Sequence, residues 1–139
     1  EAAARGELAT WETQADGALA LLILLDQFPR NAFRGDRRTY ATDALARAVA
    51  SRAVDAGFQL AVEPALRQFF RVPFQHSEHL ADQDRAVDLA RGDADGLRWA
   101  EHHRDIIRRF GRFPHRNALL GRESTEAELR FMAEGGFAG

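Results

Sequence analysis

A short segment occurs twice in this sequence, and the repeat constrains the fold more than any other feature. The first copy is FPRNAFRG at residues 28–35, and the second is FPHRNALLG at residues 113–121, with one inserted residue. Apolar residues at helical spacing precede both copies, and a segment led by Thr42 or Thr125 follows them. Each copy therefore predicts a helix that stops at Phe-Pro, a turn closed by glycine, and a further helix. A duplicated helical unit is typical of solenoid-like packing, in which each unit buries its face on the next.

Helical spacing extends over most of the chain, and no segment alternates convincingly with the period of a strand. Gly and Pro divide the apolar segments, and Asp16, Ser77 and Thr125 are candidate N-caps. We expect helices over residues 17–27 ending at Pro29, 42–56 ending at Gly57, 65–71 ending at Pro73, 77–91, and 97–110 ending at Gly111. A last helix should follow Thr125, with Glu128 in a capping box. The sequence thus predicts an all-α fold of stacked antiparallel helical hairpins, in a single domain over residues 1–139.

Composition fits a globular protein and narrows its partners. Hydrophobic residues make up 45% and charged residues 29%, the net charge is −2, and there is no cysteine. Disulfides and thiolate metal sites are therefore excluded, and the charge balance argues against a nucleic-acid partner. The longest apolar run, residues 18–25, is too short to span a bilayer and follows no basic segment of a signal peptide. We expect no membrane contact and a cytoplasmic location.

Arginine supplies all 19 basic residues. This preference has two interpretations: a GC-rich genome, or a need for planar guanidinium groups that grip a carboxylate or phosphate. Charge is also unevenly distributed along the chain. The charged residues of 102–122 are mostly basic, and those of 77–96 are mostly acidic. The two segments either face and neutralise each other or form one basic edge of a cleft.

The repeated Arg-Asn pairs are the first candidates for a binding site. Arg30 with Asn31, and Arg116 with Asn117, occupy equivalent places in the two turns. One interpretation is structural: the amides cap the following turn and the guanidinium groups bind carbonyls of the preceding helix. The other is functional: two like turns at one edge present two guanidinium groups to the same anion.

Histidines supply the second group of candidates. His76 and Glu78 lie in the segment QHSEH at residues 75–79, and His115 lies in the second repeated turn beside Arg116. Turns hold functional groups more often than helices do, and imidazole suits proton transfer near neutral pH. His76 is either hydrogen-bonded at a helix junction, part of a polar site, or a metal ligand. We assign no metal ligand and predict no cofactor, because the sequence contains no phosphate loop, nucleophile elbow or zinc-protease motif.

Several longer motifs carry a family resemblance. LLDQFPRN at 24–31, PFQHSE at 73–78, LADQ at 80–83 and HRDIIRRFGRFPHRN at 103–117 together resemble the bacterial domain-of-unknown-function family 924, over residues 18–137. The resemblance implies an all-helical, tetratricopeptide-like α-α superhelix and no established activity. It also implies an upstream aromatic-rich segment that this sequence does not contain, so we expect this chain to be a shortened form.

Three functions follow as hypotheses. The first is a binding module whose cleft, lined by Arg30, Asn31, His76, Glu78, His115, Arg116 and Asn117, holds an anionic small molecule or peptide. The second is an adaptor that recruits a protein partner. The third is a hydrolase-type enzyme that uses His and Glu side chains, so whether the chain is an enzyme stays open at this point.

Overall fold

The computed structural model describes residues 1–137, and over these residues the chain is helical, with no strand. The α-helices are α1 (Ala15–Leu22), α2 (Phe28–Ala32), α3 (Asp43–Asp55), α4 (Gln68–Gln75), α5 (Leu80–Leu89), α6 (Ala94–Phe110) and α7 (Glu126–Ala133). A π-helical turn, η3 (Ile23–Gln27), joins α1 to α2. Short 3-10 helices are η1 (Ala3–Arg5), η2 (Ala9–Thr13), η4 (Arg37–Tyr40), η5 (Phe58–Leu60), η6 (Pro64–Leu66) and η7 (Pro114–Arg116). Within residues 1–137, every helix is too short or too polar to cross a bilayer.

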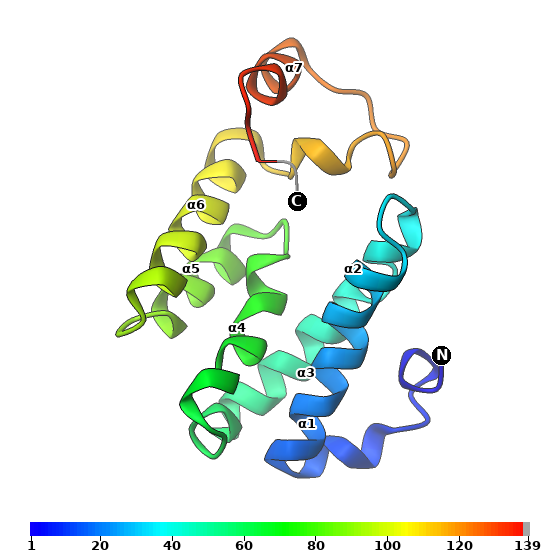
Figure 1. Cartoon of the computed structure of the whole chain (residues 1–139), viewed down its shortest axis with the longest axis vertical. Helices are drawn as coiled ribbons and strands as arrows, with labels where there is room; N and C mark the ends of the chain where they lie inside the picture. Colours follow the sequence, from blue (N-terminus) through cyan, green and yellow to red (C-terminus); the bar gives the residue numbers. More distant parts are fainter. Residues whose placement is uncertain (138–139) are drawn as a thin grey trace.

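Neighbouring helices in the chain are also neighbours in space. α1 packs on α3, α3 on α4, α4 on α5, and α5 on α6, while η7 and α7 lie at the far end of α6 (Figure 1). The predicted all-α fold of stacked antiparallel hairpins is therefore confirmed. The finer likeness to a tetratricopeptide superhelix stays a prediction.

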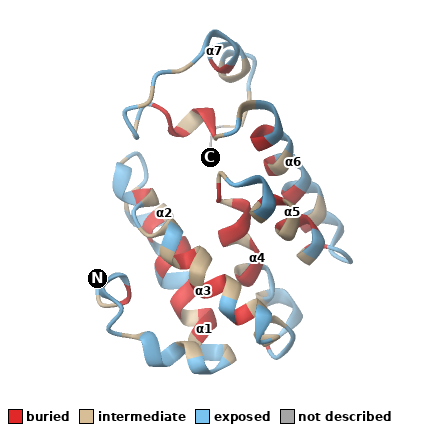
Figure 2. Ribbon diagram, turned by 180° about the vertical axis from the view of Figure 1, so that it is seen from behind, coloured by how far each residue is buried: buried red, intermediate tan, exposed pale blue. Residues whose placement is uncertain are grey.

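The main core lies where α1, α3 and α4 meet. Figure 2 shows the buried residues concentrated on the faces that these helices turn toward one another. Leu22, Phe70 and Phe74 are each only 1% exposed there. A second, smaller cluster joins Ile106 and Ile107 of α6 to the fully buried Phe113 just before η7. The second cluster fixes the repeated turn of residues 113–121 against the end of α6.

The expectation that Pro29 ends the first helix is wrong. The helix continues through Phe28, which has helical φ and ψ of −58° and −46°, to Ala32. The cause is the π-helical turn before it, in which the N–H of Phe28 bonds the carbonyl of Ile23, five residues back. A wider turn leaves room for the proline ring, which in a regular α-helix clashes with the carbonyl four residues earlier.

Other predicted boundaries also shift. α4 contains Pro73 and ends two residues beyond it, so Pro73 is not a stop. α1 begins at Ala15 with Gln14 as N-cap, and Asp16 lies inside its first turn. α5 begins at Leu80, three residues after Ser77. α6 begins at Ala94, because the carboxylate of Asp93 accepts from the N–H of Gly96 and caps it.

Three predicted helix ends are confirmed. Gly57 and Gly111 follow α3 and α6 with φ of 76° and 69°, the left-handed conformation that glycine adopts without strain. Thr125 and Glu128 form a complete capping box at the start of α7. These local signals were reliable because each depends on only a few adjacent residues.

Candidate functional site

The two repeated turns bring their arginines to one acidic side chain. Arg30, in α2, donates from Nη1 and Nη2 to the two carboxylate oxygens of Asp43, at 2.8 and 3.0 Å. Arg116, in η7, donates to the same carboxylate at 3.4 Å. Asp43 is the first residue of α3, the α-helix that comes after the first repeated segment, and it is where the two arginines meet. The anion between the two guanidinium groups is therefore one that the chain itself supplies.

Aromatic rings enclose Arg116. Its guanidinium carbon lies 4.6 Å from the ring centre of Tyr40 and 4.6 Å from that of Phe113. The Arg116 side chain is 8% exposed, and its Nε has no hydrogen-bond partner in the described part of the chain. Cation–π contacts of this kind hold a guanidinium group in place in a poorly hydrated position.

Next to Arg30, His76 binds Asp26. The imidazole Nδ1 lies 2.6 Å from Oδ1 of Asp26, which is 1% exposed in the π-helical turn. The other carboxylate oxygen accepts from the side-chain amide of Gln27 at 2.6 Å, and Nη1 of Arg30 lies 3.3 Å from Oδ1. The π-helical turn thus places Asp26 where it meets His76, at the end of α4. We call Asp26, Arg30, Asp43, His76 and Arg116 the polar junction.

The charges of the polar junction fix its protonation. Burial alone raises the pKa of Asp26. Its contacts with His76 and Arg30 have the larger combined effect and lower that pKa below its ordinary value. Burial lowers the pKa of His76, against the opposing effect of Asp26. A neutral His76 that bonds an ionised carboxylate through Nδ1 carries its proton on that nitrogen, so we assign the lone pair to Nε2.

A groove between α4 and α6 opens beside His76. It has a volume of about 940 Å³ and runs along one side of α4 to the start of α6. Its inner lining includes Arg71, Gln75 and His76 from α4 and Trp99 and His103 from α6. We call this the α4–α6 groove. Such a volume is typical of small-molecule sites.

Two largely buried polar side chains of α4 line this groove. Arg71 and Gln75 are 8% and 4% exposed, and they lie one helical turn apart. Nη1 of Arg71 binds Asp93 at 3.1 Å, but its Nε has no partner among residues 1–137, and neither does the amide nitrogen of Gln75. Both of these nitrogens are enclosed by the protein, whereas Nη2 of Arg71 is not enclosed and bonds no group among residues 1–137, so it is the donor that a molecule in the groove reaches.

His103 is a second imidazole on the same groove. Its Nδ1 lies 2.7 Å from the carbonyl oxygen of Trp99, so Nδ1 is the protonated nitrogen that donates. Its ring centre lies 6.4 Å from that of His76. Burial lowers the pKa of His103 to about 4, with a further contribution from the cation Arg116, although the hydrogen bond to the Trp99 carbonyl opposes the shift. His103 is therefore neutral at pH 7.

The other predicted site residues lie outside this groove. Asn31 is exposed, and its amide donates to the carbonyl of Gln27 at 2.9 Å. Glu78 binds both terminal nitrogens of Arg122, at 2.7 and 2.9 Å, and accepts from the N–H of Phe113 at 2.8 Å. Asn31 thus stabilises its own helix, and Glu78 ties the end of α4 to the second repeated turn.

Asn117 and His115 also have local partners. Asn117 is 1% exposed, and it accepts from Arg122 at 3.0 Å and donates to Glu128 at 3.2 Å. The ring of His115 lies against Phe113 and Phe137, with ring centres 5.7 and 5.2 Å apart. Burial lowers the pKa of His115 to about 4, with a further contribution from Arg116. Of the seven predicted residues, the structure gathers Arg30, His76 and Arg116 at the polar junction, and His76 lines the α4–α6 groove.

Sequence reasoning did not assign Asp26, Asp43, Arg71 or Gln75 to a site. Asp26 carries the clearest signal, because it follows an otherwise apolar run in the first helix, where an acid needs a buried partner. Arg71 carries a similar signal inside the apolar segment FFRVPF. Neither signal identifies the partner, which comes from a distant part of the chain.

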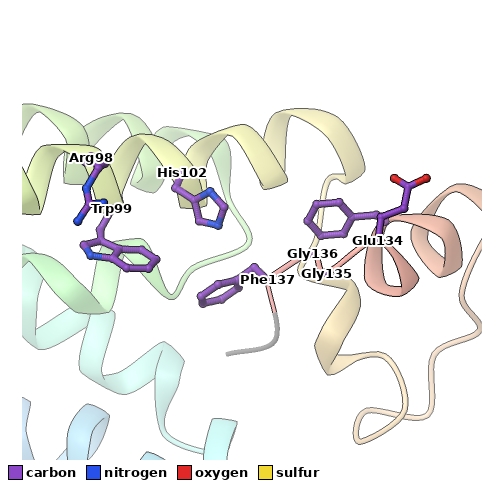
Figure 3. Close-up of a pocket in the computed structure, with 8 residues that line it drawn as sticks. Arg98, Trp99, His102, Glu134, Gly135, Gly136 and Phe137 are labelled. Atoms are coloured by element: carbon purple, nitrogen blue, oxygen red, sulfur yellow. The ribbon is translucent and has the colours of Figure 1, made fainter.

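A second hollow lies near the end of the described chain. It has a volume of about 740 Å³, and Figure 3 shows Trp99 and His102 of α6 reaching toward Phe137 across it. Its charged lining residues, Arg98 and Glu134, are exposed at the rim. Because its lining holds no buried polar group among the described residues, we place the candidate site in the α4–α6 groove instead. Nor do residues 1–137 contain three or more His, Cys, Asp or Glu side chains placed to hold a metal ion.

Comparison with known proteins gives a family and a fold. Residues 1–136 match the model of a bacterial protein family of unknown function, DUF924. A solved structure of a protein of unknown function from Agrobacterium tumefaciens resembles 96% of this chain and 77% of its own, with 53% sequence identity and a TM-score of 0.93. A comparison with curated proteins gave no match. These likenesses attach no activity to the groove.

Proposed function

The chain belongs to the bacterial DUF924 family of unknown function, and we propose that it binds a small anionic molecule in the α4–α6 groove. The observation that carries this proposal is the largely buried guanidinium group of Arg71 on that groove, whose Nη2 bonds no group among residues 1–137 and is not enclosed. An anionic ligand satisfies this donor. Since a shared fold does not define a function, the proposal rests on this site alone.

The lining of the groove is mixed in charge, with Arg67, Arg71 and Arg91 beside Asp88, Asp93 and Asp95. An anionic ligand is therefore proposed on the strength of the buried Arg71. Arg71 is a buried cation whose planar guanidinium group matches a carboxylate or phosphate. Arg67, one turn earlier on the same side of α4, adds a second positive charge to the lining. Trp99 is 48% exposed and offers a flat apolar wall on the α6 side. The ligand class that fits is a carboxylate or phosphate attached to an apolar or ring-bearing body.

Arg30 and Arg116 have a different part in this proposal. Both are bound to Asp43, and Arg30 also lies against Asp26. They hold Asp26 and His76 in place behind the groove and do not grip the ligand themselves. Of the residues predicted from the sequence, His76 remains in the proposed cleft. Arg71, and not Arg30 or Arg116, is the group proposed to bind the anion.

The test is a thermal-shift screen followed by calorimetry. Inorganic phosphate, phosphate monoesters, dicarboxylates, aromatic carboxylates and a short acidic peptide are added to the purified chain. A ligand present at about 100 times its Kd raises the unfolding free energy by about 2.7 kcal/mol, which is readily measured. We expect a ring-bearing carboxylate or phosphate to give the largest shift.

Two variants locate the binding in the groove. Arg71→Lys keeps the charge beside Asp93 but lacks the planar guanidinium group with its Nη2 donor, and we expect it to weaken binding by about tenfold. Arg130→Gln is the matched control, because Arg130 pairs with Glu126 on an exposed face of α7. An absence of any ligand-induced shift, or equal binding by the Lys variant, contradicts the proposal.

A further inference from the structure

Two imidazoles share the inner end of the α4–α6 groove, and both are held in the same tautomer. His76 donates from Nδ1 to Asp26, and His103 donates from Nδ1 to the carbonyl of Trp99. Each therefore carries its lone pair on Nε2. Among residues 1–137 no group bonds either Nε2 atom, and neither atom is enclosed. Both acceptors are free for a molecule in the groove.

The groups around the two imidazoles differ. His76 faces Asp26, Asp43 and Arg30, and it also faces His103 across the groove. An ionised carboxylate at 2.6 Å stabilises the imidazolium form when His76 accepts a proton at Nε2. The hydrogen-bond partner of His103 is a backbone carbonyl, and Arg116 is one of its charged neighbours. His76 is therefore the imidazole suited to receive a proton, and His103 the one suited to accept a hydrogen bond.

The hydroxyl next to His76 is already occupied. Ser77 donates to Oδ2 of Asp82 at 2.6 Å and accepts from the N–H of His79 at 3.2 Å. The chain contains no cysteine. Water is thus the nucleophile that a base at Nε2 of His76 activates.

We infer, on the premise that the α4–α6 groove binds an anionic molecule, that His76 is a general base that hydrolyses a carboxylic ester in that molecule. Nε2 of His76 takes one proton from water, and the resulting oxygen bonds the ester carbonyl carbon. The carbon–oxygen bond to the alcohol then breaks, and the imidazolium returns the proton to the departing alkoxide. The products are a carboxylic acid, which ionises, and an alcohol. Asp26 is a positioning residue in this reaction, because it touches His76 and not the substrate.

The ester class follows from the use of a single base. One imidazole first accepts and then returns the same proton, which suffices for an alcohol leaving group. Phosphodiester cleavage needs a base and an acid on opposite sides of the phosphorus, and the neutral His103 is not an acid at pH 7. Nη2 of Arg71 holds the anionic group of the substrate, and Nε2 of His103 accepts from the attacking water.

The experiment compares two 4-nitrophenyl esters, the neutral acetate and the mono-glutarate, which carries one carboxylate. We expect the glutarate ester to be hydrolysed faster than the acetate ester. Hydrolysis of the glutarate ester should be slower in D2O than in H2O. His76→Gln should lower kcat about 100-fold or more with little change in KM, and Arg71→Lys should raise KM about tenfold. His79→Gln is the control, since His79 is exposed three residues away and has no part in the groove.

Asp26→Asn should move the rising limb of the pH–rate profile to lower pH, because Asp26 raises the pKa of His76.

The outcomes separate the two proposals. Ester turnover that falls in His76→Gln and not in His79→Gln supports both. Ligand binding in the screen with turnover that is the same in His76→Gln as in the unaltered chain overturns the catalytic role and leaves the binding site. Neither binding nor turnover overturns both. If His76→Gln does not fold, as judged by its melting curve, equal rates in H2O and D2O for the unaltered chain overturn the catalytic role.

Discussion

The hydroxyl of Thr42 lies 2.5 Å from the carbonyl oxygen of Leu25, four residues before Pro29. Proline has no N–H, so this carbonyl lacks the donor that a regular helix supplies. Thr42, the N-cap of α3, makes no capping bond to its own helix and provides that donor instead. The contact therefore supports the continuous helix that carries Asp26 and Arg30 into the polar junction.

Thr42→Val should destabilise the chain by about 1–2 kcal/mol, because it leaves the Leu25 carbonyl without a donor at similar side-chain volume. Urea unfolding monitored by circular dichroism measures the change. Thr42→Ser keeps the hydroxyl and should stay near the unaltered stability. Equal losses in both variants would show that packing of the methyl group, not the hydrogen bond, matters here.

Asp43→Asn should cost about 3 kcal/mol, since it removes the carboxylate shared by two largely buried guanidinium groups. Asp88→Asn is the matched control: it breaks an exposed pair with Arg91, which is worth less than about 1 kcal/mol. We also expect sulfate to raise the melting temperature of Asp43→Asn more than that of the control. A similar sulfate response in both variants would mean that the two arginines do not form an anion site once Asp43 is neutral.

The low pKa of His103 makes the fold sensitive to mild acid. Its pKa falls from an ordinary 6.5 to about 4 in the folded chain, so between these values the unfolded chain binds more protons. Stability is complete above pH 6.5 and falls as the pH drops toward 4, by about 3 kcal/mol for a shift of this size. His103→Phe should reduce the dependence of unfolding free energy on pH in this window, and we expect the remaining part to come from His115, whose pKa is also lowered to about 4. An unchanged slope in urea titrations at pH 7, 5.5 and 4.5 would exclude His103 as its source.

Glu128 governs a separate, more acidic window. Arg112 binds both of its carboxylate oxygens, at 2.6 and 2.8 Å, and with the N–H of Thr125 it lowers the pKa of Glu128 to about 2 from an ordinary 4.5. This stabilisation is present above pH 4.5 and is lost as the pH falls toward 2. Glu128→Gln should remove that acid limb from thermal melts, whereas Glu126→Gln, on the exposed side of α7, should leave it unchanged.

The sequence predicted the helical fold well where local signals decide it. Gly57, Gly111 and the Thr125–Glu128 capping box act through adjacent residues, and the structure confirms all three. The prediction that Pro29 ends the helix is wrong, because the effect of this proline depends on the π-helical turn before it and on Thr42. Thr42 binds the carbonyl of Leu25, which lies 17 residues earlier in the chain. A local rule for proline contains neither fact.

The candidate site was harder to predict for the same reason. The repeat singled out Arg30 and Arg116, which lie in α2 and in η7 and not in equivalent turns. No pattern in the sequence around Asp43 identifies it as the partner that they share. Asp26 and His76 are 50 residues apart, and the groove beside them forms only when α4 packs on α6. Single-residue patterns identify chemically capable side chains, and long-range packing decides which of them meet.

The carboxylate of Asp43 also has a consequence for the order of folding. It joins Arg30, 13 residues before it, to Arg116, 73 residues after it, whereas the helices of the stack each pack on their neighbours in the chain. Contacts between neighbours close short loops and form early, and a contact across 73 residues forms after them. We therefore expect the pairing of Arg116 with Asp43 to form late, so that a partly folded chain has the helices of the groove before it has the complete support behind His76.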